Sequence, residues 1–324
     1  MKQRIFSPAT GSSNCHIQTL TPVLLGKFQK VLYVRQELDL PDGDFVDIDW
    51  SEVPTRTSTK PIVIIFHGLE GSSQSHYVKS LAQAVNARAW NVVVMNFRGC
   101  SGRLNRKPRL YHSGETGDAA FFINWLKQHY PSAPLYGIGF SLGGNMLLKL
   151  AGEQGESLLL EKIAIVSAPV KLNECTSCIE KGVGRMYQRY LFSSLKNKLL
   201  SKYNHYDYKS LINLDRNDIV NCKDIRGFDN IFTAPMHGYN DAEDYYECNS
   251  AYPYIQHIVK PCLIVHSQDD PIAPANVLPD NSSLPDHIEL NVASKGGHVG
   301  FMGGSLTKPY YWLTDTILGY FSKY

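Results

Sequence analysis

One stretch of the sequence decides the fold: Tyr136-Gly137-Ile138-Gly139-Phe140-Ser141-Leu142-Gly143-Gly144-Asn145-Met146-Leu147-Leu148. It predicts a short apolar strand, a Gly-x-Ser-x-Gly corner and an apolar helix. A strand that turns directly into a helix strains the backbone at the corner, and glycines two positions to either side let the segments pass without Cβ clashes. Ser141 should therefore project from the corner, at a helix N-terminus whose unpaired N–H groups favour negative charge.

The regions around this corner alternate between apolar runs and helical periodicity. An apolar run rich in β-branched residues suits a strand that helices cover on both faces, as in a parallel sheet. We predict such strands at 61–66, 91–97, 135–140, 162–166, 261–266 and 288–292, helices at 75–89 and 115–130, and a hairpin of 30–40 with 45–50. The sequence therefore predicts an α/β fold, a doubly wound and mostly parallel sheet with an N-terminal antiparallel edge hairpin.

The alternation stops between about Pro169 and Val259. This region is rich in Tyr, Lys and Asn, holds several amphipathic stretches and has no buried-strand run. We interpret residues 169–259 as a helical cap inserted over the carboxyl edge of the sheet, where sites in such folds lie. Residues 1–168 and 260–324 then form the core domain, with a last helix that starts after Thr307 or Pro309.

Composition excludes several classes of protein. The chain has 324 residues and a formal charge of +2, with scattered lysines and arginines, so no nucleic-acid partner is expected. No run approaches the ~18 apolar residues of a membrane span, and the N-terminus lacks the apolar core of a secretion signal. Seven cysteines, an odd number, favour reduced thiols in a cytoplasmic protein. The pair Cys175 and Cys178 has redox or zinc spacing but no second pair, which favours two incidental thiols.

Three residues have the order and positions of a catalytic triad. A serine hydroxyl at neutral pH needs a general base, and that base needs a carboxylate to orient it. In serine hydrolases built on a doubly wound sheet the order is Ser, Asp, His, each at the carboxyl end of a strand. Ser141, Asp270 and His298 fit both criteria. The alternative reading of His298, as an ordinary surface or core histidine, is weakened by its glycine neighbours and its late position.

Two neighbouring carboxylates could supply the acid. Pro271 and Pro274 follow Asp270, which places that residue at a turn where a carboxylate at a strand end can face inward. We therefore favour Asp270, and interpret Asp269 as a solvated neighbour or turn cap.

The negative charge of an acyl-transfer intermediate needs two N–H donors. The first expected donor is the backbone amide of Leu142, directly after the nucleophile. The second should come from the loop after the 61–66 strand, where Leu69 follows His67-Gly68. We expect His67 to organise this loop rather than to transfer protons. The alternative interpretation of His67-Gly68 is a plain strand-to-helix turn without a role in the site.

Three further charged residues lie near the predicted carboxyl edge: Arg98, Glu115 and Asp118. For each we expect a structural role, in ion pairs within loops or in helix capping. The aromatic residues of the cap could line an acyl pocket, although such stripes more often pack within the protein.

Several motifs together resemble one known family. They are His67-Gly68-Leu69-Glu70-Gly71, Asn96-Phe97-Arg98-Gly99-Cys100-Ser101-Gly102, His112-Ser113-Gly114-Glu115-Thr116, the Ser141 corner, Gly297-His298-Val299-Gly300-Phe301 and Asn14-Cys15-His16-Ile17-Gln18-Thr19-Leu20. The chain looks like the YheT-like α/β hydrolases, a bacterial branch related to eukaryotic α/β-hydrolase-domain lipases and fungal medium-chain ester synthase/esterases. The resemblance covers nearly the whole chain, and its nucleophile, acid and base fall on Ser141, Asp270 and His298.

The resemblance implies hydrolysis of carboxylic esters or small lipid esters, without a metal or organic cofactor. An acyltransferase or ester synthase would use the same acyl-enzyme with an alcohol acceptor, and a lysophospholipase or monoacylglycerol lipase would use it at a membrane surface. Peripheral membrane contact needs no spanning segment. A non-catalytic scaffold is the third reading, but its expected sign is a broken triad, and this triad is complete.

Overall fold

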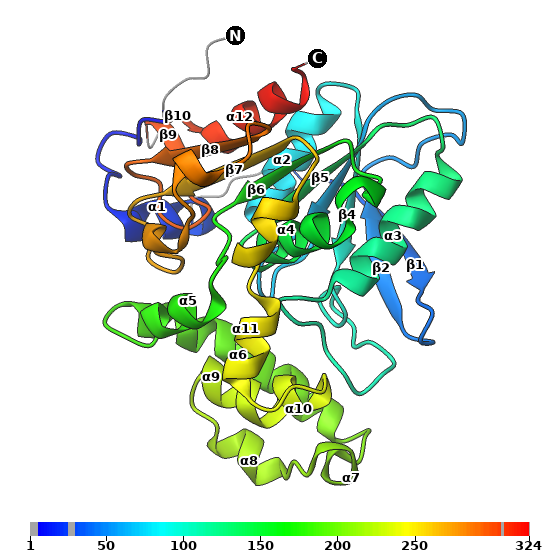
Figure 1. Ribbon diagram of the computed structural model, residues 1–324, viewed down its shortest axis with the longest axis vertical. Coiled ribbons are helices and arrows are strands. Elements are labelled where there is room, and N and C mark those ends of the chain that lie inside the picture. The colour runs from blue at the N-terminus through cyan, green and yellow to red at the C-terminus, as the bar shows by residue number, and fades with distance from the viewer. Residues whose placement is uncertain (1–5, 25–29, 306–307, 324) are drawn as a thin grey trace.

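A computed structural model describes residues 6–24, 30–305 and 308–323 (Figure 1). Its central sheet has the strand order β1-β2-β4-β3-β5-β6-β7-β8. These strands are β1 (Val34–Asp39), β2 (Phe45–Trp50), β3 (Ile62–Phe66), β4 (Asn91–Asn96), β5 (Leu135–Phe140), β6 (Lys162–Val166), β7 (Cys262–Ser267) and β8 (Ile288–Ala293). All pairings from β4 to β8 are parallel, whereas β1 and β2 form an antiparallel edge. The predicted doubly wound sheet with an edge hairpin is confirmed.

Helices cover both faces of this sheet and fill the insertion between β6 and β7. The core helices are α1 (Cys15–Leu24), α2 (His76–Asn86), α3 (Thr116–His129), α4 (Leu142–Gln154) and α12 (Trp312–Phe321). The insertion holds α5 (Leu172–Ile179), α6 (Gly184–Tyr203), α7 (Tyr208–Ile212), α8 (Arg216–Asn221), α9 (Ile225–Phe228), a π-helical turn η2 (Asp229–Thr233), α10 (Ala234–Met236), α11 (Ala242–Asn249) and a 3-10 turn η3 (Tyr252–His257). The expected helical insertion is thus present.

The central strands are buried on both faces, as their continuous apolar runs indicate. In β3, Ile62, Ile64 and Phe66 pack with the side chains of α3 and α4. Val63 and Ile65, which alternate with them, pack with α2 and α12 on the opposite face. Side chains of successive strand residues point to opposite faces, so one strand of five residues supplies both layers of the core.

The corner at Ser141 has the strained geometry that its sequence predicts. Ser141 has φ 50° and ψ −120°, in the region that L-residues rarely adopt. A Cβ on Gly139 would lie 2.5 Å from the carbonyl oxygen of Gly143. A Cβ on Gly143 would lie 2.5 Å from the carbonyl oxygens of both Phe66 and His67. Both glycines are therefore required by close backbone contacts, and they hold the serine at the carboxyl edge of the sheet.

We expect Gly143→Ala to lower the free energy of unfolding by about 1 to 3 kcal/mol, because the added methyl group must displace two backbone carbonyls of the neighbouring strand end. Gly319→Ala in α12 is the matched control, since a Cβ there meets nothing within 4 Å. In a helix that substitution should be neutral or stabilise by about 0.5 to 1 kcal/mol. Urea unfolding followed by circular dichroism measures both; equal effects would contradict the packing argument.

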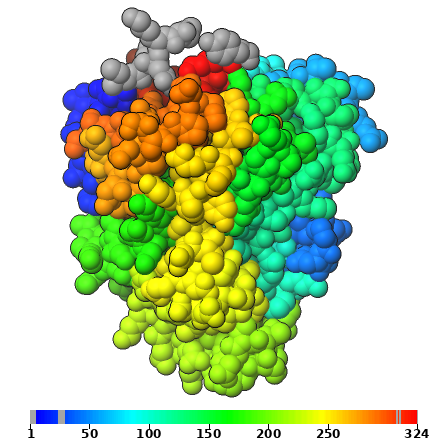
Figure 2. Space-filling view, viewed as in Figure 1, coloured from blue at the N-terminus to red at the C-terminus, as the bar shows by residue number. Residues whose placement is uncertain are grey.

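The insertion lies across the carboxyl edge of the sheet, and Figure 2 shows its green to yellow surface packed directly against the core. Its helices bury a separate apolar cluster that includes Phe192, Leu199, Tyr208, Phe228 and Phe232. Within the described residues, no helix is long and apolar enough to cross a bilayer. Met1–Ile5, part of the segment for which we expect no secretion signal, lie outside the described residues.

Two regions depart from the sequence prediction. The first 60 residues were expected to hold turns and two strands, but residues 15–24 form helix α1. The segment before the last helix forms a small hairpin of β9 (Met302–Ser305) and β10 (Lys308–Tyr311). The last helix starts at Trp312, after Pro309, in agreement with the sequence prediction; Thr307 itself lies outside the described residues.

Candidate active site

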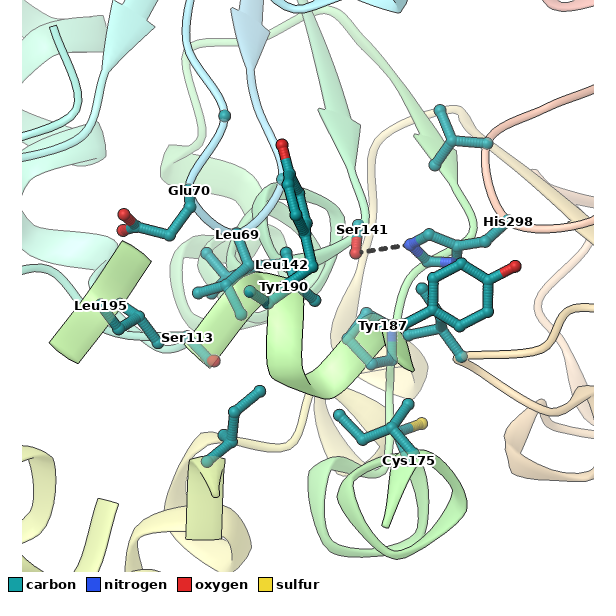
Figure 3. Close-up of a pocket in the computed structure, with 18 of the residues that line it drawn as sticks. Leu69, Glu70, Ser113, Ser141, Leu142, Cys175, Tyr187, Tyr190, Leu195 and His298 are labelled. Atoms are coloured by element: carbon teal, nitrogen blue, oxygen red, sulfur yellow. Dashed lines mark hydrogen bonds between the residues drawn. The ribbon is translucent and has the colours of Figure 1, made fainter. Parts of the chain in front are cut away.

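The three side chains that the sequence singled out meet at the carboxyl ends of β5, β7 and β8. His298 Nε2 lies 2.9 Å from Ser141 Oγ, as the dashed line in Figure 3 marks. His298 Nδ1 lies 2.9 Å and 3.0 Å from the two carboxylate oxygens of Asp270. The Asp270 side chain is fully buried and that of His298 is 10% exposed. The serine, the imidazole and the carboxylate therefore form a continuous hydrogen-bonded chain.

The Asp270 carboxylate is held as an anion. Burial alone would raise the pKa of Asp270, but the charge and hydrogen bond of His298 hold it below its ordinary value. The backbone N–H groups of Ile272 and Ala273 also donate to its Oδ1, each at 2.9 Å. The neighbouring Asp269 instead accepts the N–H of Gly297 at 3.0 Å, so it contacts the backbone of the histidine loop and not the ring.

The loop that carries His298 is fixed by residues from distant parts of the chain. The His298 N–H donates to Thr19 Oγ1 of α1 at 2.9 Å. The next amide, of Val299, donates to Ser167 Oγ at 3.1 Å. Gln18 also accepts from the Met302 N–H, at 2.8 Å. The sequence prediction missed these contacts, although Gln18 and Thr19 lie in the 14–20 motif that supported the family resemblance.

The loop after β3 places one unpaired amide beside the serine. A Cβ on Gly68 would lie 3.2 Å from Ser141 Cβ, so this loop packs directly on the corner. The Gly68 N–H donates to Tyr77 Oη at 2.9 Å, and the Glu70 N–H to Tyr111 Oη at 2.8 Å. The Leu69 N–H between them has no acceptor among the described residues.

The second amide follows the nucleophile itself. The Ser141 N–H donates to the carbonyl oxygen of Val166 at 2.8 Å, and the N–H groups of Gly144 and Asn145 donate to the Ser141 carbonyl. The Leu142 N–H at the start of α4 again has no acceptor in the described part of the chain. Figure 3 draws Leu69 and Leu142 together with Ser141 in the lining of the same pocket. Both predicted donors are thus available to a ligand.

His67 organises this loop through both ring nitrogens. Its Nε2 accepts the Phe97 N–H at 3.1 Å, and Nδ1 lies 2.8 Å from the Gly68 carbonyl oxygen. Burial lowers the pKa of His67 to about 4, so the ring is neutral at physiological pH. A neutral ring that is hydrogen-bonded to the backbone at both nitrogens fixes the loop and leaves no nitrogen free for proton transfer.

The other charged residues near the edge form ion pairs. Arg98 is buried and pairs with Asp118 at 2.6 Å, and with Asp42 and Asp44 of the edge hairpin at 2.6 Å and 3.0 Å. Burial works against this charge, yet the Asp118 contact raises the pKa of Arg98. These contacts are those expected of a structural residue, since they hold the hairpin turn against α3.

Among the residues that the structure describes, one group has metal-ligand chemistry: His112, Glu115 and His237, whose ligand atoms lie within 4.8 Å of one another. The Gly114 N–H donates to His112 Nδ1 at 3.2 Å, which leaves the ring proton on Nε2. The Arg109 guanidinium already pairs with the Glu115 carboxylate. Two of the three potential ligands are thus engaged, and the group does not fit a metal centre.

A cavity of about 960 Å³ opens at Ser141, between the sheet edge and the insertion. This volume lies in the range of small-molecule sites. Its lining is mainly apolar and includes Leu172 of α5, Leu195 of α6, and Ile225 and Phe228 of α9. The cysteine pair lies on α5, where Cys175 lines the cavity; both thiols are free, and burial raises the pKa of each.

The cavity lining also includes a buried acid, Asp229 of η2. Its carboxylate accepts the Tyr246 hydroxyl at 2.7 Å, and burial raises its pKa to about 6. An acid whose pKa is higher in the folded than in the unfolded state favours folding below its unfolded pKa, near 4. That contribution is lost as the pH rises through the folded pKa, because the native state must then carry a buried charge.

We therefore expect Asp229→Asn to raise the free energy of unfolding at pH 8 by up to about 3 kcal/mol, and by much less at pH 4. Asparagine cannot ionise but keeps an oxygen that accepts the Tyr246 hydroxyl. Urea unfolding of both proteins at the two pH values tests this. A gain that is the same at pH 4 and pH 8 would show that proton linkage at Asp229 is not its cause.

Comparison with known proteins gives a consistent picture. Residues 61–305 match the family described as the alpha/beta hydrolase fold. The chain is 46% identical to the Escherichia coli K12 protein named "Putative esterase YheT", over 98% of this chain and 93% of that one. It is 30% identical to a Saccharomyces cerevisiae monoacylglycerol lipase, over 88% and 62%, and 29% identical to human phospholipase ABHD3, over 89% and 71%.

Solved structures agree on the fold. The esterase EaEST from Exiguobacterium antarcticum superimposes with a TM-score of 0.54 at 15% identity, covering 89% of this chain and 99% of that one. The Pyrococcus furiosus esterase Pf2001 gives a TM-score of 0.53 at 17% identity, covering 92% and 91%. At such low identity these matches concern the arrangement of the chain alone.

Proposed function

Because this chain belongs to the α/β-hydrolase family, with relatives among esterases and lipases, we propose that it is a serine hydrolase that cleaves carboxylic esters through an acyl-enzyme on Ser141. One observation carries the proposal. The chain of hydrogen bonds from Ser141 through His298 to Asp270 opens into a mainly apolar cavity, beside two amides that have no acceptor among the described residues.

In the first step Ser141 Oγ attacks the ester carbonyl while His298 Nε2 takes its proton. The 2.9 Å distance between the two atoms suits this transfer. Asp270 holds the imidazole in the tautomer with its proton on Nδ1 and stabilises the imidazolium that forms. The carbonyl oxygen becomes an oxyanion and accepts hydrogen bonds from the Leu69 and Leu142 amides.

In the second step His298 returns the proton to the departing alcohol, which leaves the acyl group on Ser141. A water molecule then loses its proton to the same imidazole and attacks the acyl carbon. Collapse of the second tetrahedral intermediate releases the carboxylic acid and restores the serine. Both half-reactions use the same two amides, while His298 acts as a base and then as an acid in each of them.

The cavity favours a substrate with an apolar acyl group, because that group would bind against its lining. Its lining is mainly apolar, with apolar residues on helices α5, α6 and α9. Apolar side chains continue to the surface, where the cavity-lining residues Leu20, Met186 and Tyr190 are 41%, 68% and 77% exposed. Each buried methylene contributes about 0.8 kcal/mol to binding, so we expect kcat/KM to rise with acyl length until the cavity is filled.

A series of p-nitrophenyl esters of graded acyl length, with and without added ethanol, tests this function. We expect the free acid as the main product, with the highest kcat/KM at medium chain length. An ethyl ester as the main product would instead identify an acyltransferase with the same acyl-enzyme. Absence of turnover for the whole series, together with no covalent labelling by a fluorophosphonate, would overturn the proposal.

A further inference from the structure

The residue next to the Leu69 amide, Glu70, connects this loop to the insertion. Gly68 to Gly71 form a turn that is closed by the Gly71 N–H donating to the Gly68 carbonyl at 2.9 Å. Glu70 is the third residue of this turn and has φ 54°, whereas Leu69 before it has no positive φ. This combination defines a type II turn, whose third position favours glycine. A glutamate here costs backbone strain, so its side chain must be held by compensating contacts.

Those contacts come from both parts of the molecule. From the core, Tyr111 Oη donates to Glu70 Oε1 at 2.8 Å. From α6 of the insertion, Lys198 Nζ lies 2.7 Å from the same oxygen, and Ser194 Oγ donates to Oε2 at 2.5 Å. Ser194 and Lys198 are four residues apart, so both lie on one face of the helix.

The ion pair at the centre of this cluster is buried. The side chains of Glu70 and Lys198 are 7% and 10% exposed. The Lys198 ammonium also lies 3.3 Å from Cys100 Sγ, where burial raises the pKa of the thiol to about 11. The thiol is therefore neutral and the two charges balance each other. Because removal of one partner leaves an uncompensated buried charge, such a pair fixes the relative positions of its two elements.

The same contacts hold the residue that directly follows Leu69. Glu70 is fixed through its backbone N–H and its carboxylate by the single hydroxyl of Tyr111. In Figure 3 the Glu70 carboxylate is directed away from Ser141, and Leu69 is drawn between Glu70 and Ser141. The Leu69 side chain also packs against the apolar cluster of the insertion. Movement of α6 would therefore pull on the residue that follows the oxyanion donor.

We propose that Glu70, held by Lys198 and Ser194 of α6, is a positioning residue that sets the Leu69 amide in the oxyanion site only when the insertion is seated on the core. The inference rests on the proposed esterase function. It gives the insertion a second role besides lining the cavity, because the geometry of the catalytic donors depends on a buried contact with it. A merely structural ion pair would affect unfolding without affecting stabilisation of the transition state.

The test compares Lys198→Met, Ser194→Ala and Glu70→Gln with two matched controls. Ser193→Ala removes the hydroxyl of the residue next to Ser194. Within the described part of the chain, the Ser193 hydroxyl donates to the Tyr190 carbonyl of the same helix and not to the core. Lys209→Met breaks an exposed ion pair of the insertion, between Lys209 and Asp215. The side chains of these two residues are 52% and 55% exposed. Both controls should retain kcat/KM within about twofold, since exposed contacts of this kind contribute little.

For Lys198→Met and Glu70→Gln we expect kcat to fall about 10- to 100-fold with KM nearly unchanged. This loss is smaller than the 10²- to 10³-fold loss of kcat on removal of an oxyanion donor, because the Leu69 amide is displaced and not removed. Inhibition by a trifluoromethyl ketone, which forms a tetrahedral adduct with the serine, should weaken by a similar factor. Binding of the product carboxylate should stay the same. Lys198→Arg should recover much of the loss because it keeps the charge.

The double variant Glu70→Gln/Lys198→Met should lose no more activity than the worse single variant, since the two residues act as one unit. If Lys198→Met fails to fold, Ser194→Ala still tests the proposal, because it removes one of the two α6 contacts to Glu70 and keeps the buried pair charged. Its kcat should fall in the same direction by a smaller factor. The inference is wrong if wild type turns over esters and the folded variants Lys198→Met, Glu70→Gln and Ser194→Ala keep wild-type kcat and ketone inhibition. An inactive wild type that no fluorophosphonate labels would instead refute the esterase function itself.

Discussion

Ser141→Ala should lower kcat for p-nitrophenyl esters by a factor on the order of 10⁶, close to the loss when a serine hydrolase loses its nucleophile. Among the described residues, the hydroxyl that contacts the His298 imidazole is that of Ser141, whose Oγ lies 2.9 Å from Nε2. The acyl-enzyme cannot form, and only binding and the two amides would remain to favour direct attack by water. Steady-state rates at saturating ester measure the effect.

The matched control for this variant is Ser201→Ala, which removes an exposed hydroxyl of α6 that bonds to the Asn197 carbonyl. It should keep wild-type kcat. Both variants should unfold at the wild-type temperature within a few degrees, because neither hydroxyl supports the core. A Ser141→Ala protein that is folded and keeps more than a small fraction of wild-type kcat would contradict the assignment of the nucleophile.

Asp270→Asn should lower kcat by about 10⁴-fold, the size of the effect known for the same change in a serine protease triad. The asparagine amide can donate to His298 Nδ1, and the ring would then hold its proton on Nε2. In that tautomer Nε2 cannot take the proton of Ser141. The depressed pKa of Asp270 indicates that the native protein holds the carboxylate as an anion, which fixes the productive tautomer.

Asp269→Asn is the adjacent control. Asp269 accepts the Gly297 N–H at 3.0 Å and also lies 3.7 Å from Lys295, but it makes no bond to the imidazole. An asparagine oxygen can keep the bond to Gly297, so kcat should fall by less than about tenfold, the order of one weakened hydrogen bond. A larger loss for Asp269→Asn than for Asp270→Asn would reverse the assignment of the acid.

The arrangement of strands and of the three central residues could be predicted from the sequence. Buried parallel strands have continuous apolar runs, such as Ile62–Phe66 and Cys262–Ser267, which differ clearly from amphipathic helices. The carboxyl ends of parallel strands lie at one edge, so Ser141, Asp270 and His298 could be expected together. The glycines around Ser141 added local evidence, because only a close approach of backbones requires them there.

Elements that depend on distant contacts could not be predicted. Helix α1 has Pro22 inside it and is stabilised by bonds such as that of Gln18 with Met302, 284 residues away. The β9 and β10 hairpin contains Gly303, against which the ring of Tyr310 packs. Glycine weakens a strand signal in the sequence, and a contact across hundreds of residues leaves no local periodicity to read.

The contacts that support the site share this origin. Tyr77, Tyr111 and Thr19 hold the amides of two loops through side-chain oxygens, from three separate segments of the core. Thr19 lies in the 14–20 motif, but nothing in the local sequence distinguishes the hydroxyls of Tyr77 and Tyr111 from others. Glu70 did lie in a motif of the family resemblance, but its partners on α6 follow only from the packing of the insertion. The motifs therefore identified the loops, and the structure identified what fixes them.

The central claim is that Ser141 is an activated nucleophile. Treatment of the native protein with a fluorophosphonate, followed by intact mass measurement and peptide mapping, tests it most directly. We predict one adduct per chain, on the peptide that contains Ser141, with none on Ser141→Ala and much slower labelling of Asp270→Asn. A folded protein that forms no adduct, or one whose adduct maps to another residue, would contradict the account.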